Sequence, residues 1–179
     1  MYNLFLRCFG IAGNIKTNIM ATSKISQWIN DYLYIQNIDS EEFVEVRNFM
    51  MLWNLFEARL FDCDFGGNKS NIDNIHLSSD IISVTLQYLQ KRYTTKGATN
   101  SLFTGLHLRS NDNPTLVQKV LLGETDNSCD IVKAIVLIIY RYRNNLYHGN
   151  KEIASLPMQK DNFIYANRFL IACLEAKRE

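Results

Sequence analysis

The chain has 179 residues, of which 47% are hydrophobic and two are proline, so it can bury one core and has no long disordered arm. Its formal net charge of +1 excludes a global basic field that attracts nucleic acid non-specifically, so any contact with RNA must come from a local basic cluster. The four cysteines and three histidines are widely separated in the sequence, which excludes the usual zinc-ligand spacings.

The first twenty residues are apolar but do not match a targeting segment. The run from Met1 to Ile11 lacks a basic beginning, is interrupted by Arg7 and is too short to cross a bilayer. We expect residues 1–20 to be a weakly structured extension and residues 21–179 to form one helical domain. Because no other segment reaches membrane-spanning length without charge, we expect a soluble, cytoplasmic protein with reduced cysteines.

Apolar residues at helical spacing alternate with turn-rich segments along the chain, which predicts an all-α bundle of five or six helices. In chain order, we expect helices over residues 22–36, 40–61, 78–93, 114–122, 128–147 and 160–177. The second of these helices should bury the apolar residues Phe43, Val46, Met50, Trp53 and Leu60. Residues 64–74 are typical of a loop, and residues 101–112 indicate only a short helical turn.

The helix expected over residues 128–147 carries the strongest signal. It is apolar nearly all round between Ile131 and Ile139, which indicates a central, buried helix. Its β-branched residues would also permit a strand, but the uninterrupted length of about twenty residues favours a helix. Ser128 is the expected cap at its start, and Gly149 marks its end.

Basic, amide and imidazole groups gather where this helix ends. Arg143 offers a planar fork of donors that matches phosphate oxygens, and His148 can exchange a proton near neutral pH. On a regular helix, residues five positions apart are separated by about 140°. The two side chains can therefore converge only if the helix loosens before Gly149 or if two copies bring these ends together.

A family signature is visible in the run Arg143-Asn144-Asn145-Leu146-Tyr147-His148-Gly149, which resembles the Arg-x(4–6)-His motif of the HEPN superfamily (higher eukaryotes and prokaryotes nucleotide-binding domain). A polar residue after the arginine is usual in that motif, and here it is Asn144. The motif's setting, at the end of a long apolar helix with one more helix to follow, is also similar. The resemblance implies an HEPN-like homodimer whose paired motifs form an RNA-cleaving cleft. It also implies a toxin, an antiphage effector or an RNA-processing nuclease, with an inhibitor or antitoxin protein as a further partner.

The resemblance also implies roles for individual residues. Arg143 would stabilise charge on the scissile phosphate, and His148 would act as general base or acid on the ribose 2′-hydroxyl or the leaving oxygen. Asn144 would orient the phosphate or the histidine. The reaction would need no metal and no cofactor, and it would leave a 2′,3′-cyclic phosphate.

Four other residues are candidates for support or for substrate contact. Tyr147 could stack on a base and Asn145 could touch RNA, whereas packing and support of the helix end are the alternatives. Lys151 could extend the phosphate-binding surface or be a solvated lysine. Glu57 could hold the Arg143 guanidinium in place or face solvent. The whole chain could instead be a non-catalytic HEPN-type scaffold for dimerisation or nucleotide binding, because a fold does not guarantee an activity.

Overall fold

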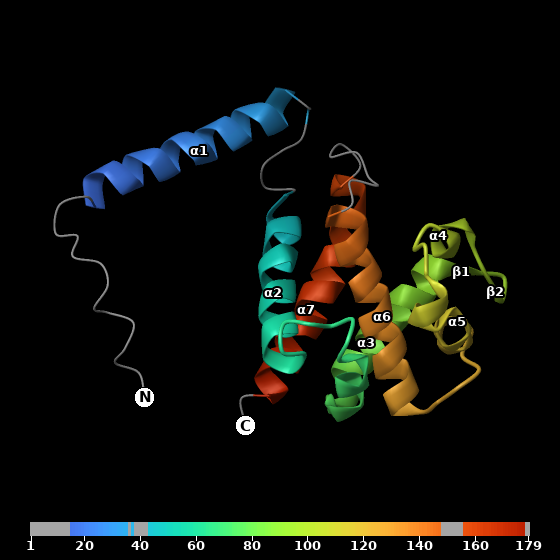
Figure 1. Ribbon diagram of the computed structural model, residues 1–179. Helices are drawn as coiled ribbons and strands as arrows, with labels where there is room; N and C mark the ends of the chain where they lie inside the picture. Colours follow the sequence, from blue (N-terminus) through green and yellow to red (C-terminus); the bar gives the residue numbers. More distant parts are fainter. Residues whose placement is uncertain (1–14, 36, 38–42, 148–155, 178–179) are drawn as a thin grey trace, which may run out of the picture. The chain divides into compact units, whose positions relative to one another are not determined.

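The computed structural model describes residues 15–35, 37, 43–147 and 156–177, and these residues are mainly helical (Figure 1). The all-α prediction is confirmed. The chain divides into two compact units, Met1–Glu41 and Glu42–Glu179, and each is described by itself. None of the described helices is both long and apolar enough to cross a membrane.

The first unit contains helix α1, which runs from Ile15 to Ile35. This helix starts before residue 22, the start predicted from the sequence, so part of the extension expected over residues 1–20 is helical instead. No glycine or proline interrupts residues 15–35, and Thr22 and Ser23 therefore lie within the helix and do not cap it. One turn apart on α1, the rings of Trp28 and Tyr32 stack with their centroids 5.5 Å apart.

The second unit contains the other helices and one short hairpin. In chain order its elements are α2 (Val44–Leu60), the 3-10 helix η2 (Lys69–Asn74), α3 (Ser79–Tyr93), strands β1 (Thr94–Thr95) and β2 (Ala98–Thr99), α4 (Ser101–Thr104), the 3-10 helix η3 (Ser110–Asp112), α5 (Pro114–Leu121), α6 (Ser128–Tyr147), the 3-10 helix η5 (Pro157–Gln159) and α7 (Lys160–Ala176). The helices predicted over residues 78–93, 114–122, 128–147 and 160–177 therefore occur with nearly the expected bounds.

The buried face of α2 differs from the predicted one. Val46 and Trp53 are buried as expected, but Met50 is 37% exposed. Phe49 and Phe56 fill the core in its place. Residues 49, 53 and 56 recur at three- and four-residue spacing and share a face with residue 46, whereas residue 50 lies about 100° from residue 49. The core beside α2 is consequently more aromatic than the sequence analysis predicts.

Asparagine side chains cap helices in this unit. The Oδ1 atom of Asn100 accepts from Leu102 N at 3.0 Å at the start of α4, and Asn113 Oδ1 accepts from Leu116 N at 3.3 Å at the start of α5. At the start of α6, Asn127 Oδ1 accepts from the backbone N–H groups of residues 129 and 130. The expected cap, Ser128, is instead the first helical residue, because the amide one position earlier already serves these donors.

Helix α6 is the central element of the second unit, as predicted. Val132 and every residue of the run 134–139 are buried. The helix contacts α3, α5 and η2, and α7 packs along α2 (Figure 1). This packing holds the last two turns of α6, where the candidate motif begins, in a fixed place in the unit.

Candidate functional site

The last two turns of α6 direct successive side chains to different neighbours, because adjacent residues on a helix point about 100° apart. The ring of Tyr140 lies 4.5 Å from the ring of Phe65, measured between centroids. Two residues further on, the Tyr142 hydroxyl accepts a hydrogen bond from the Tyr93 hydroxyl at 2.8 Å. Through these two tyrosines the segment contacts both α3 and the loop that follows α2. The arginines at positions 141 and 143 point in other directions and have different neighbours.

Arg143 is half-buried in the last turn of α6, and its guanidinium donates a hydrogen bond to Asn144 Oδ1 at 3.1 Å. Asn144 is only 3% exposed, so the core fixes the position of its amide. In the described structure, Asn144 therefore orients the Arg143 guanidinium. Its predicted action on the phosphate or on the histidine stays a prediction.

Asn145 is buried beside it, at 4% exposure. Its Oδ1 atom has no hydrogen-bond partner among the residues that the structure describes. A buried amide oxygen of this kind costs about 1–3 kcal/mol when nothing pairs with it. The burial favours the alternative that Asn145 supports the helix end, and the prediction that it touches RNA gains no support from these contacts.

The remaining motif residues are described only in part. Tyr147 is the last residue of α6, while His148 and Lys151 lie outside the described residues. The helix is regular through Tyr147, so loosening before Gly149, one of the two routes by which the side chains could converge, does not occur up to that point. That His148 and Lys151 join Arg143 around a phosphate stays a prediction.

Glu57, the predicted support for Arg143, is engaged within its own part of the fold. One carboxylate oxygen accepts from the Trp53 indole N–H at 3.0 Å, and the other accepts from Phe65 N at 3.3 Å. The carboxylate thereby ties α2 to the turn that follows it. These contacts differ from both alternatives of the sequence analysis, and support of Arg143 by Glu57 stays a prediction.

A buried charge cluster beside the motif was not anticipated from the sequence. Arg141 is 3% exposed, its Nε donates to Leu106 O at 3.0 Å, and its guanidinium lies 3.6 Å from Asp112 Oδ2. Asp112 is 1% exposed and also accepts from Lys69 Nζ at 2.9 Å. The three charges connect η2, η3 and α6, and their burial and mutual pairing indicate a structural role. The only signal in the sequence is an arginine within an apolar helix.

A second buried polar cluster connects α6 with α3 and α7. Asn162 Oδ1 accepts from the Tyr88 hydroxyl at 2.6 Å and from the Tyr142 hydroxyl at 3.4 Å. Burial raises the pKa of Tyr142 well above its usual value and also raises that of Tyr93. These phenols consequently remain neutral hydrogen-bond donors at neutral pH and hold the three helices in register.

Comparisons with known proteins found no match to this chain among protein-family models, curated proteins or solved structures. The indications of function are therefore the contacts of the last two turns of α6 and the resemblance of the Arg143–His148 run to the HEPN motif.

Proposed function

We propose that this chain is a metal-independent endoribonuclease of the HEPN type, in which Arg143 and His148 act on one phosphodiester. The observation that carries the proposal is the hydrogen bond from the Arg143 guanidinium to the buried Asn144 in the last turn of α6. This hydrogen bond holds the Arg143 guanidinium, a phosphate-binding group, in a defined position. His148, whose side chain exchanges protons near neutral pH, belongs to the same short run of sequence.

The chemistry follows from these two side chains. His148, as general base, takes the proton of the ribose 2′-hydroxyl, the 2′-oxygen attacks phosphorus, and the bond from phosphorus to the 5′-oxygen breaks. The partner subunit's His148 delivers a proton to that 5′-oxygen. The products are a 2′,3′-cyclic phosphate and a 5′-hydroxyl. Arg143 stabilises the negative charge that develops on the phosphate oxygens in the transition state.

A homodimer is part of the proposal. Helix α6 is regular through Tyr147, so up to that point it shows no loosening that would bring both groups of one copy together. A second copy supplies the missing group without distortion of the helix. We expect a dimer in sedimentation-velocity experiments, and a stable monomer that still cleaves RNA would remove the second copy from the mechanism.

The decisive experiment is RNA cleavage by the purified chain in excess EDTA. We expect cleavage by the wild-type protein and its loss in His148→Ala. The matched control is His76→Ala, which removes an exposed histidine from the loop before α3 and should leave the rate unchanged. Survival of the RNA with wild-type protein, or equal rates for the two histidine variants, would overturn the proposal.

A toxin or antiphage role follows from such an activity in a cell, where an inhibitor protein would hold it in check. Expression of the wild-type chain in bacteria should slow growth, and expression of His148→Ala should not. Equal growth of the two strains at equal protein levels would remove the toxin role and leave the cleavage proposal to the test above.

A non-catalytic HEPN-type scaffold is the second candidate function. It is supported by the burial of Asn144 and Asn145, at 3% and 4% exposure, because two of the motif's polar residues are then used to stabilise the bundle. A folded dimer that leaves RNA intact would favour this candidate over the nuclease.

A further inference from the structure

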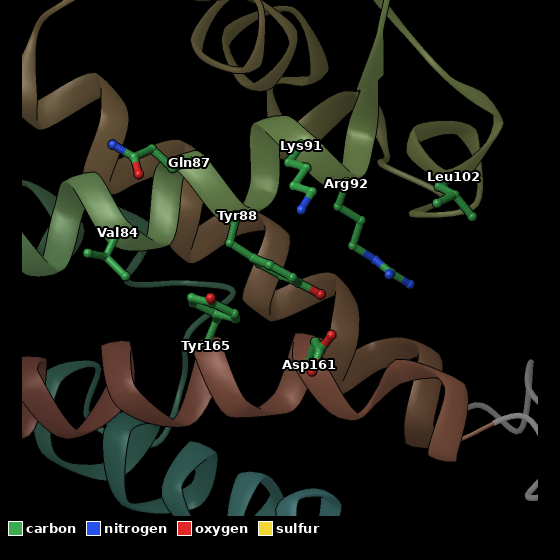
Figure 2. A pocket seen from close by; sticks show the side chains of 8 residues that line it. All are labelled: Val84, Gln87, Tyr88, Lys91, Arg92, Leu102, Asp161 and Tyr165. Carbon is green, nitrogen blue, oxygen red and sulfur yellow. The ribbon is translucent and has the colours of Figure 1, made fainter.

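A pocket of about 600 Å³ opens between α3 and α7, at the end where α4 begins (Figure 2). Its volume lies within the range of about 300–1,000 Å³ that is typical of small-molecule sites. The residues that matter for its chemistry come from three helices and are Tyr88, Lys91, Arg92, Leu102, Asp161 and Tyr165. None of them belongs to the motif at the end of α6.

One wall of the pocket is aromatic. The rings of Tyr88 and Tyr165 stack with their centroids 4.0 Å apart and their planes 8° apart. The Tyr88 hydroxyl donates to Asn162 Oδ1 at 2.6 Å, and burial raises the pKa of Tyr88 far above its usual value. Tyr88 is therefore neutral, with its hydroxyl already paired, and it offers the pocket an uncharged ring surface. The two rings cover one face of each other, so a flat ligand ring would contact the remaining face or the edges of the pair.

Opposite charges occupy the two sides of this wall. Lys91 and Arg92 extend from the last turn of α3, and Asp161 lies on the first turn of α7. Figure 2 shows the Arg92 and Asp161 side chains entering the pocket from these opposite helices. The Arg92 guanidinium also interacts with the phenols of Tyr88 and Tyr93, and its Nε atom is buried without a hydrogen-bond partner in the described structure. The lining thus provides a cationic donor, a carboxylate acceptor and a net positive charge.

A ligand that satisfies all of these groups needs a flat ring, an edge with paired donors, an edge with paired acceptors and a negative charge. Guanine carries N–H donors at N1 and N2, which match a carboxylate, and acceptors at O6 and N7, which match an arginine. Adenine offers only its 6-amino group as a donor on its pairing edge, so it would use the carboxylate less well. A phosphate supplies the charge that Lys91 attracts.

We propose that the pocket between α3 and α7 binds a guanine nucleotide. Asp161 accepts from N1–H and N2–H, Arg92 donates to the acceptor edge, the ring lies along Tyr88 and Tyr165, and Lys91 attracts the phosphate. The nucleotide comes either free from solution or as one residue of an RNA strand. The second source rests on the proposed function, because it makes the pocket a base-recognition site of the nuclease, whereas the first does not depend on it.

The test is calorimetric titration of the full chain with GMP, IMP, AMP and XMP. We expect GMP to bind about tenfold or more tightly than IMP, which lacks the N2 amino group, and than AMP. Asp161→Asn should weaken GMP by about tenfold or more and improve XMP, because a carboxamide N–H can donate to the xanthine 2-oxo group. Asp161 is exposed, so this replacement does not disturb the core.

Matched controls separate recognition from general effects of charge and folding. Asp80→Asn removes an exposed carboxylate from the first turn of α3, and it should leave all four affinities unchanged. Lys91→Ala should weaken GMP more than guanosine, because guanosine has no phosphate. No detectable GMP binding at about 1 mM, or the same change in base preference for the Asp161 and Asp80 variants, would overturn the proposal.

A third set of titrations identifies the source of the nucleotide. The His148→Ala chain is titrated with a short single-stranded RNA that contains guanine and with the same RNA containing inosine. A guanine preference here assigns the pocket to RNA, and a preference confined to GMP assigns it to free nucleotide. GMP binding by a chain that never cleaves RNA would overturn the nuclease proposal and support the nucleotide-binding pocket. RNA cleavage without GMP binding would support the nuclease proposal and overturn the nucleotide-binding pocket.

Discussion

Arg141 and Arg143 are two residues apart on the same helix, yet they lie in two different environments. Arg141 is 3% exposed, and its guanidinium is enclosed by Asp112 and the Leu106 carbonyl. Arg143 is half-buried and is oriented by the amide of its neighbour, Asn144. A step of two residues turns a helix by about 200°, which places the first arginine toward η3 and moves the second away from it.

The comparison shows why a basic residue near a motif is a poor guide to chemistry by itself. Arg141 shares the buried carboxylate of Asp112 with Lys69, so it contributes to folding and to the position of η3. Arg143 donates a hydrogen bond to the neutral amide of Asn144, and this contact orients its guanidinium. An oriented cation of this kind is what a phosphodiester in a transition state requires.

The largest effect on stability should come from removing the buried carboxylate that pairs with Arg141. Asp112→Ala leaves Arg141 and Lys69 without their carboxylate, and it should lower the free energy of unfolding by about 3–5 kcal/mol in urea titrations. The control is Asp73→Ala, because Asp73 is 58% exposed and pairs with Lys133 at the surface. Its effect should stay below about 1 kcal/mol. Equal losses in the two variants would contradict the structural role of the cluster.

The other side of the comparison is tested by activity. Arg143→Ala should lower the rate of RNA cleavage by about 10²–10³-fold, as loss of one charge-stabilising donor does, while the fold is retained. Arg143→Lys should recover only part of the rate, because an ammonium cannot form the two parallel hydrogen bonds of a guanidinium. Arg47→Ala, which removes an exposed arginine from α2, is the matched control. A wild-type rate for Arg143→Ala would show that this arginine is no more catalytic than Arg141.

The tyrosine cluster behind the motif predicts a dependence on pH. Burial raises the pKa of Tyr142 in the folded chain above its unfolded value of about 10, so the full stability is present below pH 10. Above pH 10 the unfolded chain loses the proton first, and stability falls as pH rises by up to about 1.4 kcal/mol per unit for this residue. Urea titrations between about pH 8 and pH 11 should show a smaller fall for Tyr142→Phe than for the wild type. An equal fall of the unfolding free energy with pH in both proteins would show that Tyr142 does not cause the loss of stability at alkaline pH.

The smallest effect is expected at the opposite end of α6. Asn127→Ala removes the side chain that accepts from two backbone N–H groups, and it should cost about 1 kcal/mol of unfolding free energy. Ser128→Ala should be nearly neutral, because this exposed serine is already within the helix. A larger loss of unfolding free energy for Ser128→Ala than for Asn127→Ala would show that Ser128 is the cap, as the sequence predicts.

The helices with clear periodicity and caps could be predicted from the sequence because their determinants are local. The bounds of α3, α5, α6 and α7 follow from apolar spacing, from Asn113 before Pro114 and from the glycine that follows the last turn of α6. The choice of Phe49 over Met50 could not be predicted, because both lie in an apolar run and only the packing of α7 on α2 selects between them.

In the candidate site, too, the local contacts could be predicted from the sequence and the long-range contacts could not. The contact between Arg143 and Asn144 lies within one helical turn, and the sequence points to both residues. The Arg141–Asp112 pair and the pocket between α3 and α7 join segments that are far apart in the chain, and residues 101–112, which supply Asp112, have no clear helical pattern. Long-range contacts of this kind depend on how the helices pack and leave no periodic signal in the sequence.

The most direct test of the chemistry at the end of α6 is the identity of the RNA ends that the wild-type chain produces in EDTA. Mass spectrometry of the fragments should show 2′,3′-cyclic phosphates and 5′-hydroxyls, and a single 2′-deoxy residue at the cleaved position should abolish cleavage there. Intact RNA, fragments with 3′-hydroxyl ends, or cleavage that survives the 2′-deoxy substitution would contradict a reaction carried by Arg143 and His148.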